Sequence, residues 1–466
     1  MNNLIYILSL AIISFIYVDY IAALPLGNTI SLIIFTIFIF ISIRNLSLGI
    51  ILSLFYGITT MEYPRDILDV YSALQVTNTV SYNVMNTITI GPLSLLVYLF
   101  FINTFLALYR LKMIIYYEKI FLPIMLSILL IAFISTFLNL LKVHDIFSYG
   151  LLITNIKWFL FIFMGYVQGY YIYKKNYINT MLQWFYLLPI FFGLRNMMFL
   201  TNDMVNMAPK LDLMNQAYLS LVVLIYIIVK GKWGIYENIF YRLLLFISLL
   251  NFSRAFLVFF AFSIMIAYFW KAHEKIRFNI SLIVNLSIIM GLLVLGLYLY
   301  NERLFNFLLW KLNVFDALFS SSGEMSGSGK VRTLELQNIW YILSQSLYEF
   351  LFGKGFFATY TLEAFPLTNI GVIDLKSYSM DQLNSGIYYA THSFSSSMLL
   401  KYGIVGLSIY ISLPLYLAYK LYRQNQNLIL ILIPIILIYS YYWRIEFALL
   451  IGLLFGISTK KKKYEI

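Results

Sequence analysis

Few side chains in this chain could act as an acid, a base or a metal ligand. The 466 residues include three histidines and no cysteine, and only 11% of them are charged. Thiolate catalysis and cysteine-containing metal sites are therefore excluded, and a metal-dependent mechanism has few candidate ligands. His144 ends an apolar run and His273 lies in a lysine-rich loop, so solvated roles suffice for both. His392 precedes another apolar run and is either a capping or interfacial histidine or a functional one.

Ionisable residues within apolar runs form a second set of candidates. Each costs at least a few kcal/mol at membrane depth unless it faces a cavity or a partner. Lys157, in LLITNIKWFLFIF, is expected to face the interior of a helix bundle. Arg254, in LLNFSRAFLVFF, either caps a helix and fixes topology or has a functional role, and Arg195 either reaches the interface or lines a cavity. Arg444 and Glu446 either pair with one another or bind substrate.

The composition predicts the elements that carry these residues. The chain is 62% hydrophobic with a mean hydropathy of +0.84, whereas soluble domains are about 45–50% apolar and about 25% charged. Its continuous apolar runs fit helices crossing a hydrocarbon core of about 30 Å and disfavour a β-barrel. We predict an all-α integral membrane protein with about 12–14 transmembrane helices. The candidate helices lie near 4–22, 28–43, 46–60, 91–109, 121–140, 146–172, 178–196, 214–229, 235–251, 255–270, 279–300, 396–418, 428–441 and 446–459.

The excess of positive charge predicts the orientation of these helices. A net charge of +12 would suggest nucleic acid in a soluble protein, but here the charges lie mainly between apolar runs. With the N-terminus inside, seventeen basic residues fall in short cytoplasmic segments and five in the opposite short loops. We therefore expect a retained first span, no nucleic-acid partner and cytoplasmic termini. The predicted parts are a transmembrane bundle of about 11 helices over 1–300, an external loop over 301–395, and transmembrane helices with a basic tail over 396–466.

The external loop contains the most informative patterns. The stretch 320–330, SSSGEMSGSGK, indicates a mobile loop and lacks the residues of a phosphate-binding loop. The next stretch predicts an amphipathic helix on the membrane surface, starting near Arg332 and ending at the glycines of 353–355. An arginine at a helix start opposes the macrodipole, which indicates a role in binding an anion. The apolar face of this helix is predicted to hold Leu336, Ile339, Trp340, Leu343 and Leu347.

These features together resemble the bacterial O-antigen polymerase and O-antigen ligase superfamily. The resemblance rests on an arginine in a short external turn (Arg254), a loop with an arginine and a Trp-containing helix (Arg332, Trp340), the LFGKGF turn (351–356), and a histidine leading into a Gly-x-x-Gly span (His392, Gly403, Gly406). It covers about residues 250–410. It implies a fold like that of C-type membrane glycosyltransferases and an inverting, metal-independent glycosyl transfer from undecaprenyl diphosphate, without a cofactor.

The chemistry implied by this resemblance assigns roles to particular residues. A sugar hydroxyl that attacks an anomeric carbon needs a base, and a departing lipid diphosphate needs fixed positive charge. Imidazole suits the first role and guanidinium the second. We expect His392 as general base and Arg254 and Arg332 as catalytic diphosphate ligands. Glu335 is expected to be a surface charge; the alternatives are that it orients Arg332 or acts as the base. The wider set of candidate substrate-binding residues comprises Arg254, Arg332, Glu335, Arg444, Lys157 and Arg195.

Three functions stay open at this stage. A polymerase adds a lipid-linked glycan to the end of another lipid-linked repeat unit, and a ligase transfers it to lipid A core or protein. We favour the polymerase because many such enzymes are similarly rich in Ile, Phe, Tyr and Asn and have about this number of spans. A flippase or secondary transporter for lipid-linked oligosaccharide is the third alternative, with Lys157 and Arg195 lining its cavity. The expected location is the bacterial inner membrane, with the active site on the periplasmic face. The expected partners are the lipid-linked oligosaccharide, membrane lipids, a chain-length regulator and a flippase.

Overall fold

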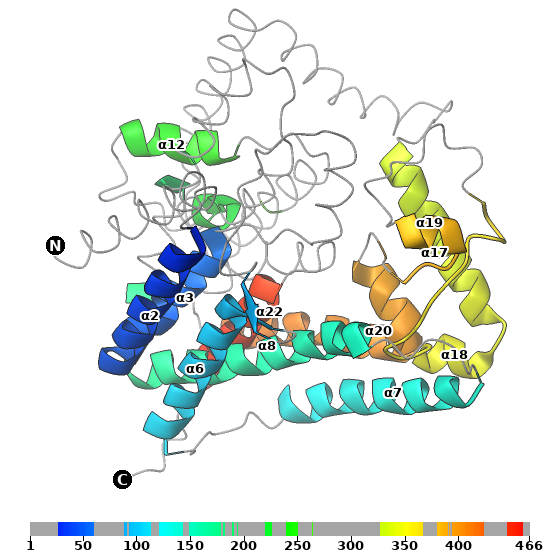
Figure 1. Ribbon diagram of the computed structural model, residues 1–466, viewed down its shortest axis with the longest axis horizontal. Helices are drawn as coiled ribbons and strands as arrows, with labels where there is room; N and C mark the ends of the chain where they lie inside the picture. Colours follow the sequence, from blue (N-terminus) through cyan, green and yellow to red (C-terminus); the bar gives the residue numbers. More distant parts are fainter. Residues whose placement is uncertain are drawn as a thin grey trace, which may run out of the picture.

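The described part of the chain is mostly helical, in agreement with the predicted all-α class (Figure 1). The structure is a computed structural model. The residues described are 27–59, 88–90, 93–112, 121–142, 149–178, 180–181, 189–190, 193, 220–225, 239–249, 263, 327–366, 380–389, 391, 394–423 and 445–459. The predicted helices at 4–22, 279–300 and 428–441 lie outside these residues.

A first group of helices comes from the N-terminal quarter of the chain. Helices α2 (Gly27–Arg44) and α3 (Leu46–Thr59) pack against each other and against α6 (Leu95–Arg110). Strands β1 (Thr89–Ile90) and β2 (Leu93–Ser94) pair antiparallel, so α6 begins four residues later than the predicted 91. Buried polar side chains join these helices, with Asn103 Nδ2 donating to Ser53 Oγ at 2.9 Å.

Helices α8 (Tyr149–Lys174) and α22 (Ile445–Ile457) pack together most closely (Figure 1). Each has two glycines four residues apart, Gly165 and Gly169 on α8 and Gly452 and Gly456 on α22. A Cβ on any of these would overlap backbone atoms of the facing helix. Small residues at this spacing allow two helix backbones to approach closely, an arrangement frequent in membrane helices.

The positions of the apolar runs are confirmed for the helices that the structure describes. Helix α7 (Phe121–Lys142) begins at the predicted residue, and α12 (Ile239–Leu249) lies within its predicted range. One described segment, Ser395–Leu421, is long and apolar enough to cross a membrane, judged by length and composition. The number of transmembrane helices and their orientation stay predictions.

The segment predicted as an external loop folds against the start of the last long helix. It contains α17 (Gly327–Ser344), α18 (Leu347–Phe352) and α19 (Met380–Ser385), followed by α20 (Phe394–Arg423). Figure 1 shows α17 and α19 together, with α18 close to α7 and α20. These elements share a small apolar core of Val331, Ile339, Leu343, Ala358, Tyr360, Leu362, Tyr388, Leu399 and Leu400.

Two boundary predictions in this segment are wrong, and the first changes the position of Arg332. Helix α17 begins at Gly327, so residues 327–330 are helical rather than part of the mobile loop. Arg332 therefore lies in the second turn, beyond the first turn where the macrodipole acts most strongly. The predicted continuous helix is interrupted at Gln345 and Ser346, because the Ser346 side chain accepts a hydrogen bond from the Glu349 N–H and begins α18 as an N-cap.

Candidate functional site

Helix α20 is interrupted at Gly403, and the LFGKGF turn packs against the interruption. Gly403 has φ 66° and ψ −170°, which no α-helical residue adopts. The Leu400 and Lys401 carbonyls, just before the break, accept hydrogen bonds from the N–H groups of Lys354 and Gly355, each at 2.9 Å between N and O. Two motifs about fifty residues apart in the sequence thus form one backbone junction, called the glycine junction below.

Glycine is required on both sides of the glycine junction. Gly353 has φ 74°, and a Cβ there would overlap the backbone of Lys401 and Gly403. A Cβ on Gly403 would in turn overlap the Leu351 carbonyl. Positive φ costs an L side chain about 1–2 kcal/mol even in open space. The prediction that a positive-φ glycine ends the helix at 353–355 is confirmed.

Helix α7 provides the third component of the glycine junction. The Ser135 hydroxyl donates to the Phe352 carbonyl at 2.9 Å, and the Thr136 hydroxyl accepts from the Phe356 N–H at 2.8 Å. Gly355 lies so close to Thr136 that a Cβ would overlap it. Both hydroxyls are buried, so each satisfies a backbone group that would otherwise lose its hydrogen bond to water. The pair Ser135-Thr136 within an apolar run was the sequence signal for this contact, and it was missed.

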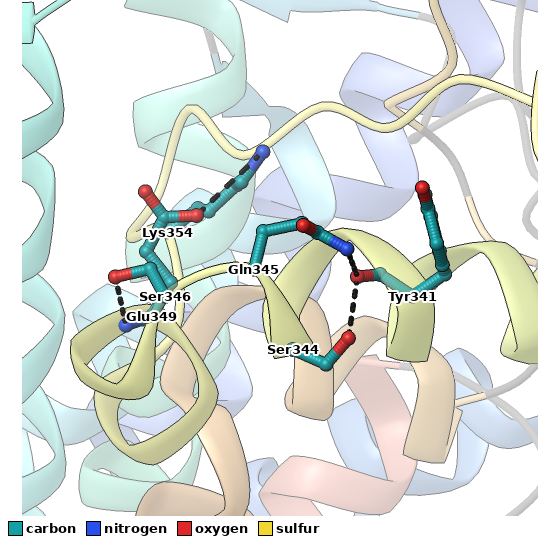
Figure 2. A network of polar contacts seen from close by, with 6 residues as sticks. All are labelled: Tyr341, Ser344, Gln345, Ser346, Glu349 and Lys354. Carbon is teal, nitrogen blue, oxygen red and sulfur yellow. Dashed lines mark hydrogen bonds and ion pairs between the residues drawn. The ribbon is translucent and has the colours of Figure 1, made fainter.

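Polar side chains also stabilise the chain just before the glycine junction (Figure 2). At the end of α17, the Tyr341 carbonyl accepts from Ser344 Oγ at 2.7 Å and Gln345 Nε2 at 3.3 Å. At the end of α18, Lys354 Nζ lies 3.9 Å from Glu349 Oε2. The lysine of the LFGKGF turn is therefore paired with a carboxylate of the preceding helix.

Aromatic rings surround the buried side of the glycine junction. The fully buried Tyr402 ring contacts Phe356 and Phe159 edge to face, with centroids 6.1 and 5.9 Å apart. Further along α20, Trp158 Nε1 donates to the Tyr410 hydroxyl at 2.6 Å. Lys401, the residue before Tyr402, is only 8% exposed. The first half of α20 is thus fixed against both α8 and the LFGKGF turn.

A second buried polar contact lies within the small core of α17. Glu335 is fully buried, and its Oε1 accepts a hydrogen bond from the Tyr360 hydroxyl at 2.6 Å. Tyr360 and Tyr388 exchange two backbone hydrogen bonds at 2.9 Å, and their ring centroids are 5.6 Å apart. Burial raises the pKa of the Tyr388 hydroxyl above its ordinary value. This hydroxyl is therefore protonated at neutral pH.

The same helix face contains a buried amide, one turn along from Glu335. Asn338 Nδ2 donates to the Phe365 carbonyl at 2.9 Å, and Asn338 Oδ1 accepts from the Phe365 N–H at 3.0 Å. Glu335 and Asn338 thus attach the segment 356–366 to α17 at two points. Neither attachment was predicted from the sequence.

The structure corrects one expectation about α17 and shows how its apolar residues are distributed. Glu335 was expected to be a surface charge, which is wrong because it is fully buried and accepts a hydrogen bond from the Tyr360 hydroxyl. The residues predicted for the apolar face are divided: Ile339 and Leu343 are fully buried, whereas Leu336, Trp340 and Leu347 are 43%, 49% and 76% exposed. Contact of the exposed residues with a membrane surface stays a prediction.

Of the predicted site residues, the structure describes the side chains of Arg332 and Glu335. Both are on α17, and Arg332 is half-buried. Lys157 lies in α8, but its side chain is outside the described part of the structure. Arg195, Arg254, His392 and Arg444 lie outside the described residues, so their proposed roles stay predictions. No three His, Asp or Glu side chains are grouped for metal binding within the residues that the structure describes.

Two of the features behind the family resemblance, the LFGKGF turn and the Gly-x-x-Gly helix, contact each other in the part of the chain that the structure describes. This contact was not predicted from the sequence. No protein-family model, curated protein or solved structure matches this chain.

Proposed function

We propose that the chain is a polytopic inner-membrane glycosyltransferase that polymerises a surface polysaccharide. In this proposal it has about 12–14 transmembrane helices and its active site faces the periplasm. It transfers a glycan from undecaprenyl diphosphate to the end of another lipid-linked repeat unit, with inversion and without a metal. O-antigen ligation, with lipid A core or protein as acceptor, uses the same donor chemistry.

Exposed apolar side chains support the membrane part of the proposal. On α7, five large apolar residues are 47–63% exposed in the described part of the chain: Leu126, Leu130, Phe133, Ile134 and Phe137. Helix α2 exposes a comparable set, which includes Leu32, Ile33, Ile37, Phe40 and Ile43. Contiguous apolar surface of this kind is rare on soluble proteins but normal for a surface in contact with lipid. The glycine-mediated packing of α8 on α22 points the same way.

The glycine junction is the observation that carries the enzymatic part of the proposal. The LFGKGF turn, the Arg332 helix and the glycines of the last long helix are among the features that carry the family resemblance. In the structure the turn bonds directly to the break at Gly403, and α17 packs on the first half of the same helix. Parts of one catalytic site have to lie close together, and this contact between two of the features supports the proposal; Arg254 and His392 lie outside the described residues.

The proposed reaction assigns a step to each predicted residue. The acceptor hydroxyl oxygen bonds to the anomeric carbon of the donor while the bond from that carbon to the diphosphate oxygen breaks. The hydroxyl proton moves to His392, and the lipid diphosphate leaves with the bonding electrons. Arg254 and Arg332 stabilise the negative charge on the leaving group, which grows in the transition state. Attack opposite to the leaving group inverts the anomeric configuration.

The break in α20 also favours a second candidate, a flippase for lipid-linked oligosaccharide. Transporters often place discontinuous helices at their substrate or ion sites, where unwound carbonyls coordinate the cargo. Here the Leu400 and Lys401 carbonyls already accept hydrogen bonds from the LFGKGF turn. This occupation favours a structural junction over an ion site, and it makes the enzyme the first choice.

The glycans of a deletion strain separate these functions. Loss of a polymerase leaves single repeat units attached to the final acceptor, and loss of a ligase leaves long chains still attached to the lipid carrier. Loss of a flippase leaves lipid-linked units facing the cytoplasm. We expect single units only, with long chains restored by the wild-type chain and not by His392→Ala or Arg254→Lys. Long chains of normal length in the deletion strain would exclude the proposal.

A further inference from the structure

The buried carboxylate of Glu335 is costly and needs a reason. It is fully buried, one helical turn from Val331 and Ile339, which belong to the same apolar core. Removing a carboxylate from water costs several kcal/mol, and hydrogen bonds return only part of this. An apolar side chain at this position would give a stable core at lower cost. A residue that is retained despite this cost often fixes a geometry rather than adding stability.

The geometry that Glu335 fixes can be followed through its partner. The Tyr360 hydroxyl donates to Glu335 at 2.6 Å, a short distance for a hydrogen bond between a hydroxyl and a carboxyl group. The Tyr360 backbone bonds in both directions to Tyr388, and the two rings pack together. The next residue, Tyr389, donates its N–H to the buried Gln382 side chain at 3.2 Å. Tyr388 is therefore held relative to α17 through Tyr360, and Tyr389 is held relative to α19 through Gln382.

In the sequence, these contacts lie between two residues that are predicted to be catalytic. Arg332 lies one turn before Glu335 on α17, and Tyr388 lies four residues before His392 in the sequence. The contacts from Glu335 to Tyr360 and from Tyr360 to Tyr388 thus connect α17, which contains Arg332, to a residue that precedes His392 by four positions in the sequence. A reaction that needs a base and a diphosphate ligand at a set separation loses rate when that separation varies.

We propose that Glu335 is a positioning residue that acts through Tyr360 to hold Tyr388 in register with α17. This inference rests on the proposed function for its catalytic consequence, but its structural part stands without it. Glu335 does not bind the sugar or the diphosphate in this account. Its carboxylate orients the Tyr360 hydroxyl, and Tyr360 orients the strand-like contact with Tyr388.

The test uses the full-length protein in lipid vesicles with lipid-linked oligosaccharide as donor and acceptor. The variants are Tyr360→Phe, which removes one hydroxyl, Glu335→Gln and the double variant. Tyr341→Phe and Glu363→Gln are matched controls, because Tyr341 and Glu363 are exposed residues within the same stretch, 327–366. We expect each single variant to lower kcat about tenfold or more with KM for the lipid donor unchanged. The double variant should be no slower than the worse single one, because both remove the same contact.

Hydrogen exchange of the same variants separates failure of this inference from failure of the proposed function. We expect the amides of residues 360 and 388 to exchange faster in Tyr360→Phe and unchanged in Tyr341→Phe. Faster exchange in a protein whose wild type has no transferase activity would remove the proposed function and keep the positioning role. Unchanged exchange together with unchanged kcat would overturn the inference. A raised KM with unchanged kcat would also overturn it, since it would mean that Glu335 binds substrate. If Glu335→Gln does not fold, Tyr360→Phe alone decides the outcome.

Discussion

Two regions of the molecule use glycine for different physical reasons. Between α8 and α22, Gly165 and Gly452 lie inside regular helices, and glycine is needed only because the opposite backbone occupies the space of a Cβ. At the glycine junction, Gly353 and Gly403 also have positive φ values of 74° and 66°. The first region therefore depends on close approach alone, and the second depends on close approach and on backbone conformation.

This difference indicates what each region is for. Two continuous helices in close contact form a rigid scaffold, and small residues at regular spacing suffice for it. The glycine junction instead interrupts a helix and fills the interruption with another segment of the chain. Sparsely populated backbone conformations persist mainly where a particular local geometry matters, and such places are frequent near functional sites. We therefore propose that the glycine junction shapes the candidate site and that α8 and α22 provide structural support.

The largest expected effect is that of Gly403→Ala. The new methyl group meets both penalties, an unfavourable φ and overlap with the Leu351 carbonyl. We expect a loss of about 3 kcal/mol or more of stability and loss of chain extension. The midpoint of thermal unfolding in detergent, measured beside glycan length in cells, checks this. A stable and active Gly403→Ala protein would mean that α20 is not interrupted as described.

Gly165→Ala should be the next most damaging change. Residue 165 has ordinary helical geometry, so only the overlap with the Leu449 carbonyl acts, and we expect a loss of about 1–3 kcal/mol. Since α8 and α22 have to move apart, the thermal midpoint should fall while the remaining folded protein keeps its activity. An activity loss larger than the loss of folded protein would contradict the assignment of this interface to structural support.

Thr136→Val tests the contribution of α7 to the glycine junction. The variant keeps the shape of the side chain but leaves the Phe356 N–H without its 2.8 Å acceptor. A buried donor without a partner costs about 1–3 kcal/mol, toward the lower end where the backbone can adjust. Thr136→Ser retains the hydroxyl and is the control. Equal thermal midpoints for the two variants would show that this hydrogen bond contributes nothing.

Gly386→Ala isolates the cost of backbone conformation. Gly386 has φ 68°, but no atom lies within 4 Å of the position that the new methyl group would occupy, so overlap is absent. We expect a loss of about 1 kcal/mol, well below that of Gly403→Ala. Thermal unfolding of the two variants in parallel gives the comparison. A loss as large as that of Gly403→Ala would show that conformation alone dominates at both positions.

The smallest expected effect on stability is that of Lys354→Gln. Lys354 and Glu349 are partly exposed, with 3.9 Å between the charged atoms, and such pairs contribute about 0–1 kcal/mol. The thermal midpoint should therefore change little. Glycan length in the same strain shows whether the lysine of the LFGKGF turn has a role beyond its ion pair. A large drop in the thermal midpoint would mean that the ion pair between Lys354 and Glu349 stabilises the fold more than its exposure indicates.

The fold was predictable where the apolar pattern is strong. Helices α2, α3, α7 and α22 lie within a few residues of their predicted ranges, because each is an apolar run bounded by polar residues or glycine. The break at Gly403 could not be predicted in this way. The sequence around it, KYGIVGL, continues the apolar pattern, and the break depends on donors from the distant LFGKGF turn.

The candidate site was predictable in its motifs but not in its contacts. The LFGKGF turn and the glycine at 403 were chosen from the sequence, and they meet in the structure. The inward face of α17 was not predictable from hydrophobic spacing, because Glu335 and Asn338 face inward to partners that lie 25 and 27 residues further along the chain. Tertiary partners of this kind override the local pattern.

The most direct test of the central claim is a transferase reaction with purified components. The full-length protein, in lipid vesicles with a chelator present, is given single lipid-linked repeat units taken from the deletion strain. The account predicts products with two or more repeat units on one lipid, released undecaprenyl diphosphate in equal amount to the bonds formed, and much slower turnover with Arg332→Lys. Single units that stay unchanged with folded wild-type protein would contradict it.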